Sequence, residues 1–122
     1  MINTKALYMD LLKDERVETL VGENVYDAQN GGKIDFPCII VIDSSQSDSE
    51  YADNRHHVQK CTVQIHIYTK TLEDYPTTTE IGEVIADIFN GESWACTLSR
   101  EETDIEEDVR HRVMEFSKGI YL

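Results

Sequence analysis

VQKCTVQIHIYT, residues 58–69, is the stretch of sequence that decides the fold. Its apolar and polar side chains alternate, which is the pattern of a strand with one face against a core. The apolar positions are Cys61, Val63, Ile65 and Ile67, and the polar positions are Thr62, Gln64, His66 and Tyr68. The stretch therefore predicts a long strand with a buried face and a mixed polar face.

A continuous apolar run precedes this strand. Pro37 restricts Phe36 to extended geometry and opens the run Cys38-Ile39-Ile40-Val41-Ile42. Five apolar residues in a row, mostly β-branched, are typical of a central strand that is buried on both faces. Because one polar segment, 43–54, separates the two strands, we expect them to form an antiparallel hairpin.

The clearest helical pattern follows the long strand. Thr77 and Glu80 have the spacing of a capping box, in which each side chain bonds the backbone N–H of the other residue. The apolar residues that follow recur at helical spacing, at Ile81, Val84, Ile85, Ile88 and Phe89. Gly91 is placed to end this amphipathic helix.

Weaker signals complete the order of elements. We expect helices at 3–13 and from Asp14 to Gly22, and strands at 24–28, 95–102 and 109–117. Strands and helices are segregated along the chain, which favours an α+β fold. The prediction is a mainly antiparallel sheet, with the N-terminal helix and the long amphipathic helix packed on one face.

The composition excludes several classes of protein. The 122 residues predict one domain, 1–122, and 24 acidic against 11 basic residues give a net charge of −13. Such acidity argues against specific nucleic-acid binding and against an anionic membrane surface. No apolar run approaches the ~20 residues of a membrane span, and residues 1–5 lack the apolar core of a secretory signal.

No pattern in the chain predicts a catalytic, cofactor or metal site. The sequence lacks the common nucleotide-binding, zinc-protease and hydrolase motifs. Cys38, Cys61 and Cys96 form no CxxC pair and are expected to be buried free thiols. The four histidines, His56, His57, His66 and His111, are expected at the surface or in interfaces. The acidic connections 43–53 and 101–108, where much of the charge gathers, lack calcium-loop spacing and are expected to be solvated.

The succession of these segments resembles a known family. Its parts are Asn24-Val25-Tyr26-Asp27, a Gly-rich loop, the strand 36–41, the strand 58–69, the helix 79–90 and the closing strand 110–116. In this order the chain is similar to the tail terminators and tail-completion, or head-to-tail joining, proteins of siphophages. The resemblance covers nearly the whole chain and includes no catalytic motif.

The resemblance implies a structural virion protein without enzymatic activity or cofactors. Such proteins form a hexameric ring that caps the tail tube and joins it to the head connector, through which DNA passes. The implied partners are further copies of the chain, the tail tube protein and the head-completion or stopper protein. The implied location is the tail or neck of the virion and the cytoplasm of the bacterial host. The gene for such a protein can also belong to a prophage.

The polar segment between the two strong strands is the candidate interface. Its length and acidity predict that residues 44–54 project into the channel or towards a neighbouring ring. Acidic groups there would repel phosphates and keep the DNA mobile. The candidate interface or lumen residues are Asp48, Glu50, Tyr51, Asp53 and Arg55.

A second function remains open from the residues alone. A small acidic inhibitor or DNA mimic that binds a basic partner would also explain the net charge. Mimicry requires carboxylates arrayed along one face at phosphate-like spacing. The sequence instead places them in loops and on helix exteriors, which favours the structural role.

Overall fold

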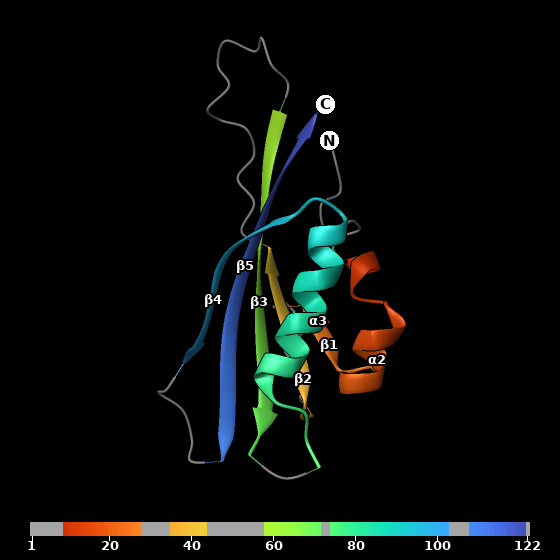
Figure 1. The fold of residues 1–122 in the computed structure, drawn as a ribbon, viewed down its shortest axis with the longest axis vertical. Helices are drawn as coiled ribbons and strands as arrows, with labels where there is room; N and C mark the ends of the chain where they lie inside the picture. The colour runs from red at the N-terminus through yellow and green to blue at the C-terminus, as the bar shows by residue number, and fades with distance from the viewer. Residues whose placement is uncertain (1–8, 28–34, 44–57, 72–73, 103–107, 122) are drawn as a thin grey trace.

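The computed structural model describes residues 9–27, 35–43, 58–71, 74–102 and 108–121 (Figure 1). The elements are α2 (Glu15–Val21), β1 (Val25–Asp27), β2 (Cys38–Asp43), β3 (Val58–Lys70), α3 (Thr78–Gly91), β4 (Ala95–Glu102) and β5 (Val109–Tyr121). Residues 9–11 are also helical and are the described end of the helix expected at 3–13. No helix within these ranges is long and apolar enough to cross a membrane.

The strands form one sheet in the order β1-β2-β3-β5-β4. The predicted antiparallel pairing of β2 with β3 is confirmed, with Ile40 opposite His66. The β3–β5 and β4–β5 pairs are also antiparallel, whereas β1 runs parallel to β2. The predicted α+β fold with a mainly antiparallel sheet is therefore confirmed.

The long strands β3 and β5 are the centre of the sheet. They pair over their whole length, from Val58 opposite Tyr121 to Lys70 opposite Val109. β5, which was expected to end at residue 117, continues to Tyr121 because β3 supplies a hydrogen-bonding partner for its last residues. This 13-residue ladder gives the helices a long surface to pack on.

Both helices cover the same face of the sheet, with α3 along the strands and α2 beside it (Figure 1). The apolar stripe of α3 packs on the apolar side of β3 and β5, as its period predicts. The buried cluster includes Val17, Val21, Ile39, Val41, Val63, Ile65, Ile67, Ile81, Ile85, Phe89, Met114 and Phe116. This interface between helices and sheet is the core.

The capping box of α3 is confirmed. The Glu80 N–H donates to the Thr77 hydroxyl over 3.0 Å, and the Thr77 N–H donates to the Glu80 carboxylate over 3.1 Å. Further along, α3 approaches β5 closely at Gly82, where an added Cβ would lie 3.2 Å from the Met114 sulfur. The helix includes Gly91 as its last residue rather than ending before it.

Two burial predictions were wrong in part. In β2, Ile39 and Val41 are buried, but Ile40 and Ile42 are partly exposed, because the helices cover only one face of the sheet. Among the thiols, Cys38 and Cys61 are buried, whereas Cys96 is exposed on the edge strand β4. Burial, helped by the nearby Asp35 charge, raises the pKa of the Cys38 thiol to about 11.

Candidate functional site

The sheet face opposite α2 and α3, called here the outer face, carries polar and aromatic side chains. Strand register places residues from β2, β3, β5 and β4 side by side on this face. They are Ile40, Ile42, Thr62, Gln64, His66, Tyr68, Leu98, Arg100, Glu102, His111, Val113, Glu115 and Ser117. A mixed surface of this kind suits protein contacts, in which apolar and hydrogen-bonding groups are both used.

A row of hydrogen bonds crosses the outer face from the edge strand to its centre. The Thr97 hydroxyl donates to Glu115 over 3.1 Å, and the Gln64 amide donates to the other oxygen of that carboxylate over 3.4 Å. The Gln64 amide oxygen then lies 3.4 Å from Nε2 of His66. Nδ1 of His66 lies 2.9 Å from Nε2 of His111. The row ends in a pair of imidazoles.

The row fixes the proton positions of the first imidazole. Because the Gln64 oxygen can only accept, Nε2 of His66 carries the hydrogen and Nδ1 presents its lone pair. His111 then donates to that lone pair through its own Nε2–H. The Tyr68 ring stacks on the His111 ring, with centroids 4.2 Å apart, and this contact orders the group further. The His66 and His111 rings, with centroids 5.1 Å apart, meet end to end through their hydrogen bond.

The environment keeps His66 neutral at pH 7. Burial of the half-buried ring lowers its pKa, the nearby His111 lowers it further, and the Glu102 charge acts in the opposite direction. Arg100 and Glu115 are the other charged groups on this face, and Arg100 pairs with Glu102 over 3.0 Å. A neutral imidazole keeps the lone pair that the hydrogen bond between the two histidines requires.

This pKa shift predicts a specific loss of stability in acid. The unfolded chain takes up a proton at His66 near pH 6.5, whereas the native state resists protonation until a lower pH. Stability from this site is therefore present above pH 6.5 and is lost as the pH falls towards the native pKa. Urea unfolding measures the free energy of unfolding at about pH 7.5 and about pH 5.5, and this free energy should fall more in the wild-type protein than in a His66→Gln variant. Equal losses in the two proteins would contradict the lowered pKa of His66.

The helical layer carries most of the described negative charge. Residues 9–23 and 80–92 contain nine acidic and two basic side chains, whereas the five strands together contain five acidic and six basic ones. The two bases are Lys13 and Arg16, and Arg16 already binds Asp87 over 2.7 Å and Asp14 over 3.2 Å. The sequence-based view that charge gathers in two connections was therefore incomplete, because α2 and α3 form a third acidic region.

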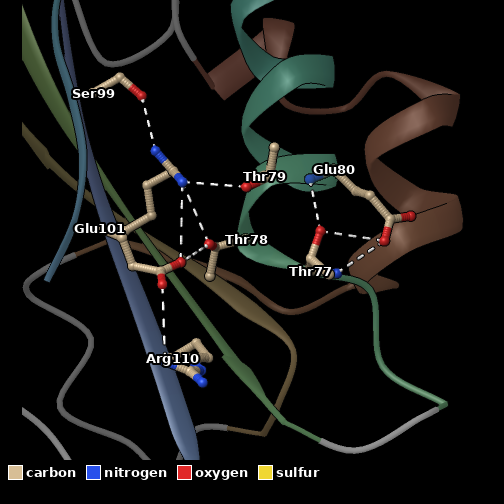
Figure 2. A network of polar contacts seen from close by, with 8 residues as sticks. Thr77, Thr78, Thr79, Glu80, Ser99, Glu101 and Arg110 are labelled. Atoms are coloured by element: carbon tan, nitrogen blue, oxygen red, sulfur yellow. Dashed lines mark hydrogen bonds and ion pairs between the residues drawn. The ribbon is translucent and has the colours of Figure 1, made fainter. Parts of the chain in front are cut away.

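A polar network ties the start of α3 to the strands β4 and β5 (Figure 2). The Thr78 hydroxyl donates to Glu101 over 2.6 Å, and Arg110 and Arg112 lie 3.9 and 4.0 Å from the same carboxylate. Arg112 also donates to the Ser99 hydroxyl over 3.3 Å. Because these residues neutralise and bond one another, the network holds α3 in place.

The predicted interface residues Asp48, Glu50, Tyr51, Asp53 and Arg55 lie in 44–57, outside the described residues. Their role stays a prediction. The histidine pair was missed because His66 and His111 are 45 residues apart in sequence. The signal that existed was the polar face of the strand 58–69, but the register that brings His111 to it is set only by folding.

A family model decides the identity of the chain. The model of the tail completion protein gp17 matches residues 5–120. The chain belongs to this family. The resemblance inferred from the sequence is confirmed, and the tail completion protein is a structural component of a phage-like virion and not an enzyme.

Solved structures support the fold of this tail completion protein. One similar chain comes from the "Virion of native gene transfer agent (GTA) particle" and superposes with a TM-score of 0.63. The two chains are 16% identical, and the match covers 95% of this chain and 92% of the other. No curated protein sequence matches the chain.

Proposed function

We propose that this tail completion protein forms a hexameric ring that caps the tail tube and joins it to the head connector. The observation that carries the proposal is the family match over residues 5–120. Its partners are then further copies of itself, the tail tube protein and the head-completion or stopper protein. The ring lets DNA pass without binding it.

The two edges of the sheet supply a physical reason for ring formation. Among the described strands, β1 and β4 each pair with one neighbour only, and they lie at opposite edges (Figure 1). An edge strand exposes backbone N–H and C=O groups that can pair with another chain. Contact between the β4 edge of one copy and the β1 edge of the next is head-to-tail, and repetition of such a contact forms a ring when the rotation between copies closes.

Electrostatics supports passage of DNA through this ring. Phosphates are repelled by carboxylates, so acidic surfaces near the channel keep the genome free to move. The acidic residues of segment 44–54 are proposed to project into the channel or towards a neighbouring ring. The acidic layer of α2 and α3 adds to the repulsive field of the assembled ring.

The test of the ring is the size of the assembly with and without tail tubes. We expect light scattering and electron microscopy to detect hexamers, either in solution or at the ends of tubes made from the tail tube protein of the same particle. A monomer that never caps the tubes would contradict the proposal. Tight binding of that monomer to a nuclease or polymerase would instead favour the acidic inhibitor.

A further inference from the structure

The two imidazole nitrogens on the outer face are spaced as ligands of one ion would be. Nδ1 of His66 and Nε2 of His111 are 2.9 Å apart. Imidazole nitrogens lie about 2.0–2.1 Å from zinc, so two ligands at about 90–109° around one ion are about 2.9–3.4 Å apart. An ion can replace the proton between these nitrogens if His111 carries its hydrogen on Nδ1 instead, and if each ring turns so that its lone pair points at the ion and not at the other ring.

The surrounding residues orient the first ligand. Gln64 accepts from Nε2–H of His66 and is itself held by Glu115, over 3.4 Å in each case. A ligand histidine is usually fixed in this way, because a hydrogen bond at the second nitrogen sets both the tautomer and the ring angle. Nδ1 of His66 is the lone-pair nitrogen before any ion arrives, as coordination requires.

From this geometry we propose that His66 and His111 bind one late first-row divalent metal ion, of the class of Zn²⁺, Ni²⁺ and Cu²⁺. Imidazole suits these ions, whereas Mg²⁺ and Ca²⁺ prefer oxygen ligands. Glu102 lies on the neighbouring strand opposite His111 and pairs with Arg100 over 3.0 Å, so these two residues together add no net charge beside the imidazoles. The site does not depend on the proposed ring and adds a ligand to the protein's structural role.

The number of protein ligands limits how strongly the site binds. In the described part of the chain, no group of three or more His, Cys, Asp and Glu side chains is arranged around a metal position. Water then fills the remaining positions, and the site is open to exchange. Binding should be reversible by chelators and should weaken in acid, because each imidazole must lose its proton to coordinate.

The direct test uses Cu²⁺ as a spectroscopic probe of the full chain. His56 and His57 could bind copper themselves, so the test protein carries the His56→Gln and His57→Gln substitutions. We expect one Cu²⁺ per chain in a titration, and pulsed electron paramagnetic resonance should detect two imidazole nitrogens on the ion. No binding, or coupling to one imidazole only, would overturn the proposal.

Variants of the pair supply the second arm of the test. In the same background, His66→Gln and His111→Gln should each remove one imidazole from the spectrum and abolish the rise in melting temperature caused by Zn²⁺. Mg²⁺ at the same concentration should not change the melting temperature of the parent protein or of either variant. Circular dichroism confirms that the variants are folded. Zn²⁺ stabilisation that persists in folded variants would place the ion elsewhere and refute the site.

Discussion

Replacing Phe89 with alanine is expected to lower the free energy of unfolding by about 3–5 kcal/mol. Phe89 is fully buried where α3 ends against the sheet. Its ring lies 4.6 Å from the Phe116 ring and 5.6 Å from the Trp94 ring, measured between centroids. The loss combines the transfer of a large apolar side chain with the cavity left between helix and sheet. Urea denaturation followed by circular dichroism measures it.

Phe36→Ala is the matched control for this substitution. Phe36 is only partly buried, and its ring lies 5.0 Å from the Lys70 ammonium group. The same truncation there removes less buried area and one cation–π contact of about 0.5–1 kcal/mol. We expect the control to cost less than half as much as Phe89→Ala. Equal costs would mean that the packing of α3 on β5 is not the main source of stability.

The elements that could be predicted from sequence are those whose signals are local. The alternation in 58–69 and the spacing of Ile81, Ile85 and Phe89 reflect contact with a single buried surface, and both were confirmed. The capping box at Thr77 was also confirmed, because all of its bonds lie within four residues. Geometry of this kind can be predicted because it depends on residues that are neighbours in the sequence.

The features that could not be predicted depend on partners far away in the chain. The parallel pairing of β1 with β2, the exposure of Ile40 and the meeting of His66 with His111 all follow from strand order and register. Strand order was also what exposed Cys96, since β4 lies at the edge. A strand's own sequence marks which residues share a face, but not which strand lies beside it or whether a helix covers that face.

The charge of α2 and α3 likewise separates what the sequence predicts from what only the fold reveals. The net charge of −13 was available from composition, but its placement required the fold. Once the elements are placed, the strands are nearly neutral and the helical segments carry nine acidic against two basic residues. In a ring, the orientation of this layer decides how much of the field reaches the channel, because exposed charges are screened within about 8–10 Å at ordinary salt.

Deletion of residues 44–54, with a short Gly/Ser linker in their place, is expected to impair tail joining or DNA release while leaving the fold intact. The β2–β3 ladder, from Cys38 opposite Tyr68 to Asp43 opposite Val63, lies outside the deletion. Changing the length of a loop costs little, since each doubling of its length changes the closure free energy by only about 0.6 kcal/mol. Plaque counts, and electron micrographs of free heads and tails, measure the result.

A variant of unchanged length separates acidity from shape in this segment. Asp48→Asn, Glu50→Gln and Asp53→Asn together remove the negative charge and keep every residue position. If the segment acts by repelling DNA, particles of this variant should assemble but eject their DNA slowly. If the segment acts by contact with a neighbouring ring, Tyr51→Ala should impair joining more than the charge changes do. Wild-type infectivity of particles that carry the full deletion would show that residues 44–54 are needed neither for joining nor for DNA release. The proposed ring would still be tested separately, by its assembly on tail tubes.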